Sequence, residues 1–183
     1  MGNASALQIR DAVPADRDSI RQVALSAYEQ YAAVMPEERW LAYRESIAGS
    51  VDGEGPMARF VAELDGEIVG SALLFMSSEQ AYGRPELAIG GAIVRLLAVA
   101  PGARGKGVAT ELLRESVRRS RQLGSPDLHL HTSDMMAAAV RLYERLGFER
   151  AVDKDVSNGD TLVKCYRLDL TKPVPFERET AVT

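Results

Sequence analysis

Cysteine and histidine are both scarce in this chain of 183 residues. Cys165 is the single cysteine, which excludes an internal disulfide framework and favours a reducing compartment. The first residues, MGNASALQIR, also lack the apolar core of a signal peptide, so we expect a cytoplasmic protein. His129 and His131 are the only histidines, and a metal site rich in histidine and cysteine is therefore not expected.

The chain also lacks a long block of positive charge and a long apolar run. Its net charge is −4, whereas a sequence-independent grip on nucleic acid needs a concentrated basic surface. No apolar run approaches the roughly 20 residues of a membrane span. We therefore expect no nucleic-acid partner and no membrane partner. The hydrophobic fraction of 46% is typical of a soluble globular protein, and the length predicts one domain, residues 1–170, with a C-terminal tail, residues 171–183.

The hydrophobic pattern predicts a mixed α/β sheet rather than a regular βαβ array. An Asp65-Gly66 turn joins the two strands of the clearest hairpin, because glycine tolerates a positive φ. Residues 77–85 read as a loop. The expected strands are 7–10, the hairpin within 59–75, 92–99, 128–130, 148–156 and 161–170, and the expected helices are 14–31, 37–47, 107–123 and 134–146.

The most informative segment is residues 97–113, LAVAPGARGKGVATELL, which joins an apolar strand to an amphipathic helix. Gly105 and Gly107 allow the backbone to approach a ligand closely. The first N–H groups of the following helix have no partner within the helix, and Arg104 and Lys106 add mobile positive charge. Such a loop suits a phosphate or a pyrophosphate.

Two familiar phosphate loops do not match this segment. A P-loop needs a serine or threonine after Gly-Lys, but Gly107 follows Lys106 here. A dinucleotide fingerprint needs a third glycine where Thr110 stands. A tight strand-to-helix turn with no ligand remains an alternative for this loop taken alone.

A second segment, residues 137–148 with the sequence AAAVRLYERLGF, reads as a helix that ends in Gly-Phe. On this helix alone, the favoured interpretation of Tyr143 is a packed core residue. Together, and in this order, the two segments resemble the GNAT superfamily of N-acetyltransferases. The resemblance extends over about residues 7–170.

The resemblance implies a mostly antiparallel sheet of six or seven strands, splayed between the fourth and fifth and flanked by about four helices. Acetyl-CoA, the implied co-substrate, would lie between strands 92–99 and 128–130. Backbone groups near Leu97 and Val99, where the family has a strand irregularity, would bind the pantetheine arm and the acetyl carbonyl, stabilising the oxyanion. Tyr143 would act as general acid for the departing thiolate. The pyrophosphate would be held by the N–H groups of Arg104, Gly105, Lys106, Gly107, Val108 and Ala109.

The chain departs from the family at two positions. Met136 stands where many relatives have an asparagine that contacts the pantetheine arm. The strand before the loop reads AIVRL and lacks the glutamate that serves some relatives as general base. A water chain or His131 could take that role, since imidazole titrates near neutrality. Glu63 and Asp134 are weaker candidates.

The resemblance implies transfer of an acetyl group from acetyl-CoA to a primary amine, a small molecule, by direct attack in a ternary complex. Aromatic and acidic residues between Tyr28 and Tyr43 could bind a cationic amine, or they could simply pack the helices together. Two alternatives are a protein lysine or N-terminal acetyltransferase and a non-catalytic sensor of acyl-CoA. A homodimer is compatible with the family. The sequence does not specify the acceptor, the general base, the oligomeric state or the acyl-chain preference.

Overall fold

The computed structural model describes residues 6–158 and 161–177. By its internal contacts the chain divides into two compact units. The first unit consists of Met1–Leu74 and Leu96–Leu113, and the second of Phe75–Arg95 and Arg114–Thr183. Strand β4 (Ala92–Val99) and helix α4 (Val108–Gln122) each contribute residues to both units.

The first unit is built on an antiparallel meander of β1 (Gln8–Asp11), β2 (Ala58–Leu64) and β3 (Glu67–Phe75). The turn between β2 and β3 places Asp65 at φ +54° and Gly66 at φ +81°. Two consecutive positive φ values match the twist of the flanking strands, which is why Asp-Gly closes this hairpin. The predicted hairpin and its turn are confirmed.

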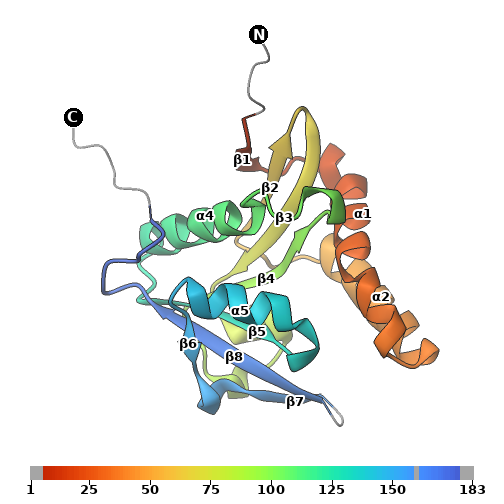
Figure 1. Cartoon of the computed structure of the whole chain (residues 1–183). Helices are drawn as coiled ribbons and strands as arrows, with labels where there is room; N and C mark the ends of the chain where they lie inside the picture. Colours follow the sequence, from red (N-terminus) through yellow and green to blue (C-terminus); the bar gives the residue numbers. More distant parts are fainter. Residues whose placement is uncertain (1–5, 159–160, 178–183) are drawn as a thin grey trace. The chain divides into compact units, whose positions relative to one another are not determined.

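Two helices pack side by side on the core of the first unit (Figure 1). Helix α1 (Arg17–Tyr28) buries Ile20, Val23, Ala24 and Ala27, the apolar positions that recur at helical spacing. Helix α2 (Glu37–Asp52) adds Ile47 and Val51 to the same cluster. The predicted first helix is shorter than expected, because Pro14–Asp16 and Glu29–Val34 form 3₁₀ turns at its two ends.

Gly70 on β3 allows this strand to approach the beginning of α4. A Cβ at Gly70 would lie 2.7 Å from Cγ1 of Val108 and 3.1 Å from Cδ1 of Leu112. It would also lie 3.1 Å from the carbonyl oxygen of Ala98. The missing side chain of residue 70 therefore sets how closely β3, β4 and the first turn of α4 can pack.

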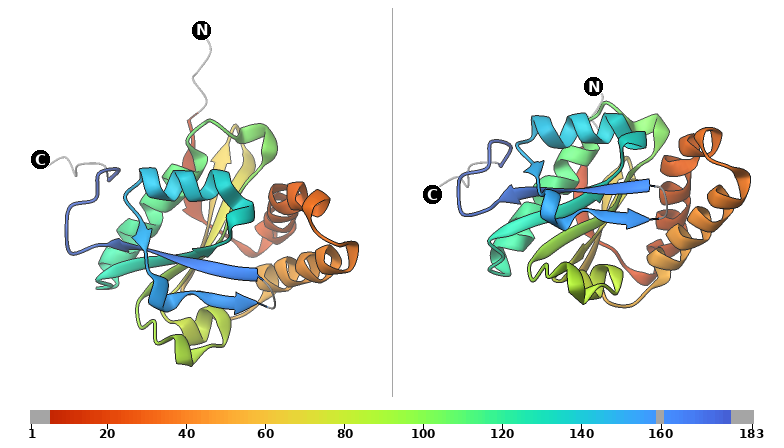
Figure 2. Two further views of the ribbon diagram at one scale, coloured as in Figure 1. Left: turned by 60° about the horizontal axis from the view of Figure 1, so that its bottom comes forward. Right: turned by 90° about the horizontal axis from the view of Figure 1, so that it is seen from below.

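The second unit pairs β5 (Asp127–Thr132) antiparallel with β8 (Thr161–Asp169). Helix α5 (Ala137–Arg145) runs over one face of this pair (Figure 2). Strands β6 (Glu149–Arg150) and β7 (Val156–Asn158) also pair with β8. The 3₁₀ turn Val152–Lys154 separates β6 from β7, so the single predicted strand 148–156 is wrong. The sequence also predicts that strands 148–156 and 161–170 form a hairpin around Asn158-Gly159, and Gly159 lies outside the described residues.

The strand order is β1-β2-β3-β4-β5-β8-β6, with β7 paired to β8. Pairing of β4 with β5 is parallel, and the other described pairs are antiparallel. The mixed, mostly antiparallel sheet is thus confirmed. Its count is corrected: residues 6–158 and 161–177 contain eight strands rather than six or seven, and five α-helices rather than about four. No helix within these residues is long and apolar enough to cross a membrane.

The additional helix is α3 (Ser78–Tyr82), where a loop was predicted. The hydroxyl oxygen of Ser77 accepts a hydrogen bond from the N–H of Gln80 at its N-terminus. Gly83 ends the helix at φ +65°. An N-cap serine and a C-terminal glycine are helix signals, so the sequence did contain the information for α3.

Replacement of Gly70 by alanine tests the close approach of β3 to α4. Because the added Cβ would overlap Val108, we expect the free energy of unfolding to fall by about 1–3 kcal/mol, measured by chemical denaturation. Gly49→Ala is the matched control, since a Cβ there meets nothing within 4 Å on exposed helix α2. The control should be as stable as the parent or slightly more stable. An unchanged stability of Gly70→Ala would contradict the packing described above.

Candidate active site

The backbone of β4 is irregular at Leu96, which has φ +49° within the strand. A residue with a Cβ reaches this region at a cost of about 1–3 kcal/mol, so the surrounding packing must hold it there. Leu96 is partly buried against the core of the first unit. In the described part of the chain, pairing of β4 with β5 is limited to Ala92 and Ile93, before the irregularity. The predicted irregularity next to Leu97 is therefore present.

Tyr28 contacts the strand directly after this irregularity. The hydroxyl of Tyr28, at the end of α1, donates a hydrogen bond to the carbonyl oxygen of Leu97 at 3.3 Å. Leu97 and Val99 are both half-buried. The hydroxyl of Tyr28 thus contacts the backbone of β4 at the position where the resemblance implies binding of the pantetheine arm.

The loop after β4 has the geometry of an anion cradle. Gly105 and Gly107 both lie at φ +78°, a conformation that side chains rarely adopt. The first intrahelical bond of α4 runs from the N–H of Glu111 to the carbonyl of Gly107 at 3.0 Å. The N–H groups of Val108, Ala109 and Thr110 precede it and have no intrahelical acceptor, as at any helix start. These residues fit a pyrophosphate group.

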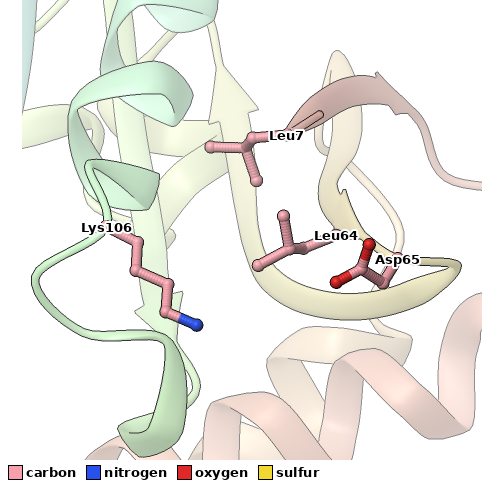
Figure 3. Close-up of a pocket in the computed structure, with 4 residues that line it drawn as sticks. All are labelled: Leu7, Leu64, Asp65 and Lys106. Carbon is pink, nitrogen blue, oxygen red and sulfur yellow. The ribbon is translucent and has the colours of Figure 1, made fainter. Parts of the chain in front are cut away.

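The two cations of the loop behave differently. The guanidinium of Arg104 donates to the carbonyl oxygen of Ala27 at 3.2 Å and to Oε1 of Gln30 at 3.4 Å. Carbonyl oxygens at the C-terminus of α1 attract a cation, so the guanidinium of Arg104 lies against the end of this helix. Lys106 is exposed and points toward the β2–β3 turn (Figure 3).

Lys106 lines a cavity of about 230 Å³ in the first unit. Its other lining residues are Leu7, Leu64 and Asp65 (Figure 3). The cavity combines one cation and one carboxylate with two leucine side chains. It extends from the candidate pyrophosphate loop to the turn of the hairpin.

Four aromatic rings form a continuous cluster at the end of α1 and the start of α2. The ring centroid of Tyr28 lies 6.1 Å from that of Tyr31 and 6.0 Å from that of Tyr43. Trp40 lies 6.2 Å from Tyr43. All four rings are half-buried. This aromatic cluster therefore packs the helices together and also offers ring surface to a ligand.

Tyr143 lies on α5 in the second unit and is 8% exposed. Its ring centroid is 5.8 Å from that of Phe148, which follows Gly147 at φ +97°. Met136 is half-buried at the N-cap of α5, and its N–H donates to the carbonyl of Ser133 at 2.9 Å. The helix and its Gly-Phe end are thus confirmed, whereas the roles of Tyr143 and Met136 stay predictions.

His131 on β5 is bonded through both ring nitrogens. Its Nε2 lies 2.9 Å from the carbonyl oxygen of Lys154, and its Nδ1 lies 2.9 Å from the hydroxyl of Tyr82. Burial is the main effect on the imidazole and lowers the pKa of His131, so the neutral ring predominates at neutral pH. Sequence reasoning did not find this pairing with Tyr82.

The weaker base candidates are carboxylates in ion pairs. Oε2 of Glu63 accepts from Nε of Arg10 at 3.0 Å, and Oδ1 of Asp134 lies 2.7 Å from Nζ of Lys164.

Burial raises the pKa of the Cys165 thiol to about 12, and its side chain is fully buried. A thiol with so high a pKa is a poor nucleophile at neutral pH.

Comparison with protein families gives one match across most of this architecture. The model of the acetyltransferase (GNAT) family matches residues 18–148, which include β4, the glycine loop, α4 and α5. The chain belongs to the GNAT family. Residues 18–148 thus form an acetyltransferase domain of this family.

Curated relatives named as acetyltransferases match this chain over part of their length. N-acetyltransferase family 8 member 2 of Rattus norvegicus is 29% identical over 63% of this chain and 49% of its own length. Mycothiol acetyltransferase of Streptomyces avermitilis is 33% identical over 51% of this chain and 27% of its own length. Streptothricin acetyltransferase of Streptomyces lavendulae is 38% identical over 42% of this chain and 41% of its own length. The chain spans about half the length of these relatives or less.

Solved structures share the GNAT fold over nearly the whole chain. PaiA N-acetyltransferase of Thermoplasma acidophilum, solved with coenzyme A, has a TM-score of 0.65 at 16% identity and covers 87% of this chain and 98% of that one. The yncA protein of Salmonella typhimurium, solved with its cofactor acetyl-CoA, has a TM-score of 0.59 at 20% identity, covering 93% and 97%. These likenesses concern the fold.

Gly107→Glu tests the anion cradle. The substitution places a side chain at φ +78° and a carboxylate where the pyrophosphate is expected, so we predict no detectable heat of acetyl-CoA binding in a calorimetric titration. Gly49→Glu adds the same charge at an open, exposed position of α2 and should bind as the parent does. Binding by Gly107→Glu within about threefold of the parent, less than 1 kcal/mol, would remove the loop from the co-substrate site.

Proposed function

We propose that this GNAT protein transfers the acetyl group of acetyl-CoA to a primary amine of a small molecule, by direct attack in a ternary complex. The observation that carries the proposal is one continuous segment with two features. The backbone of Leu96 within β4 is left-handed, and the glycine loop follows directly after this strand. The first feature frees strand backbone for the acyl arm, and the second supplies N–H groups for the pyrophosphate.

On the donor side, most of the proposed roles fall to backbone groups. The N–H groups from Arg104 to Ala109 bind the pyrophosphate, and those near Leu97 and Val99 bind the pantetheine arm and the acetyl carbonyl. A donor aimed at that carbonyl oxygen stabilises the negative charge that develops there during attack. The side chain of Lys106 adds long-range attraction for the phosphates. Met136 at the N-cap of α5 would contact the pantetheine arm.

Proton transfer is the task of side chains. Tyr143, which is almost buried, would protonate the departing thiolate, since a phenol is a competent general acid in a dry environment. The amine must lose a proton before or during attack, and His131 is the proposed proton acceptor. Its neutral imidazole at pH 7 suits that role.

Two observations support a small cationic amine as acceptor. The aromatic cluster of Tyr28, Tyr31, Trp40 and Tyr43 offers ring faces that attract a cation. The names of two relatives also refer to small molecules, mycothiol and streptothricin. A homodimer stays a prediction of the family resemblance.

The function is tested by thiol release from acetyl-CoA across a panel of small amines, peptides with free N-termini and lysine peptides. We expect release with one or more small amines. Release with peptides alone would identify a protein acetyltransferase. Tight binding of acetyl-CoA without release for any acceptor would identify a non-catalytic sensor.

Tyr143→Phe tests the general acid. Removal of the hydroxyl should lower kcat by about a hundredfold, a typical contribution of acid catalysis, because the thiolate then leaves unprotonated. The dissociation constant for acetyl-CoA should change less than threefold. An unchanged kcat would make Tyr143 a packing residue against Phe148.

A further inference from the structure

We propose that Tyr82 and His131 act as one proton-accepting pair, with Tyr82 as the group that faces the amine and His131 as the final acceptor. The proposal rests on the proposed acetyl transfer and adds Tyr82, whose role the family resemblance does not supply. Tyr82 comes from α3 and His131 from β5, 49 residues apart in sequence, and their hydroxyl and Nδ1 are 2.9 Å apart.

The hydrogen bonds fix the tautomer of His131. A carbonyl oxygen can only accept, so Nε2 of His131 carries the proton and donates to Lys154. Nδ1 therefore holds the lone pair, and the phenol of Tyr82 donates to it. Since both nitrogens of His131 are engaged, a proton reaches its lone pair through the hydroxyl of Tyr82.

Arg95 keeps the ring of Tyr82 in place. Its guanidinium carbon lies 4.8 Å from the centroid of Tyr82, and Nη1 donates to the carbonyl of Ala81 at 2.6 Å. The two rings of the pair meet edge to face, with centroids 5.0 Å apart. Arg95 immediately precedes Leu96, the irregular residue of β4. Arg95 thus connects the pair to β4 within the second unit.

Charged and titratable groups surround the pair on several elements. His131 faces Arg95 from β4, His129 from its own strand, and Lys154 and Asp155 from the segment before β7. Tyr82 faces Arg95 and Cys165 of β8. Burial raises the pKa of Tyr82 above its usual range and lowers the pKa of His131. At neutral pH the phenol is therefore protonated and the imidazole is neutral, as a relay requires.

The proton transfer balances without an added reactant. The ammonium of the acceptor gives one proton to the phenol oxygen of Tyr82 while Tyr82 gives its own proton to Nδ1 of His131. The products are a neutral amine, an intact phenol and an imidazolium ring. The amine then attacks, and His131 returns its proton to solvent after turnover.

The test is the pH dependence of kcat/KM for thiol release by the wild-type chain, Tyr82→Phe, His131→Gln and the double variant. In the wild type, kcat/KM should increase with pH below about pH 6.5, and we call this increase the acidic limb. It arises because only the neutral ring of His131 accepts a proton, and the pKa of His131 is lowered from its ordinary value of about 6.5. Each single variant should lose this limb and about a hundredfold in rate at pH 7.5. The double variant should be no slower than either single one, because the pair acts as a unit.

Tyr166→Phe is the matched control. It also removes a hydroxyl from a tyrosine ring that contacts a guanidinium, since Cζ of Arg150 lies 5.5 Å from the ring centroid of Tyr166. This variant should keep the acidic limb. An active wild type whose limb survives in Tyr82→Phe would overturn the pair, as would a pH-independent loss of rate accompanied by a lower melting temperature. No thiol release by the wild type with any amine would instead overturn the proposed function.

The tautomer gives a readout that does not depend on activity. Nitrogen NMR of the wild-type imidazole should show a protonated Nε2 and an unprotonated, hydrogen-bonded Nδ1 for His131 at pH 7.5. Tyr82→Phe should shift the Nδ1 resonance by removing its donor. A protonated Nδ1 in the wild type would overturn the relay.

Discussion

The left-handed backbone of Leu96 is the constraint on which the proposed co-substrate site depends. A leucine at φ +49° inside a strand interrupts the regular ladder of β4. In the part of the chain that the structure describes, pairing with β5 occurs only at Ala92 and Ile93, ahead of this point. The strand backbone that follows is thereby available for other partners, and Tyr28 already donates to the carbonyl of Leu97. The conformational cost, about 1–3 kcal/mol, is offset by packing of the leucine side chain against the core of the first unit.

The last turn of α1 supports both halves of the donor site. Tyr28 bonds to β4 after the irregularity, and the carbonyl of Ala27 accepts from Arg104 of the glycine loop. One short segment of helix therefore bonds to both the strand and the loop. The aromatic cluster continues from Tyr28 through Tyr43 to Trp40, so the same segment also borders the proposed acceptor surface. This arrangement gives Arg104 a structural role beside the backbone role that the resemblance implies.

Sequence patterns predicted the local parts of this structure and missed the long-range ones. Strand 92–99, the Asp65-Gly66 turn and the glycine loop follow from apolar periodicity and from glycine at positive φ, both of which are local signals. Leucine carries no signal for a left-handed conformation, so the residue at the irregularity came only from the structure. The anchoring of Arg104 and the Tyr82–His131 bond join residues 77 and 49 positions apart, and no local pattern encodes such pairs. Helix α3 is different, because its capping serine and terminal glycine were visible.

The central claim is that backbone amides of β4 and of the glycine loop bind acetyl-CoA. The most direct measurement is an amide-resolved NMR titration of the chain with acetyl-CoA, followed by a second titration with pantetheine. We predict that acetyl-CoA shifts the amide resonances of Gly105, Gly107 and Ala109 together with those near Leu97 and Val99. Pantetheine, which has no pyrophosphate, should shift only the β4 group. Saturable binding of acetyl-CoA that leaves both groups of amides unshifted would contradict a backbone site on β4 and the glycine loop.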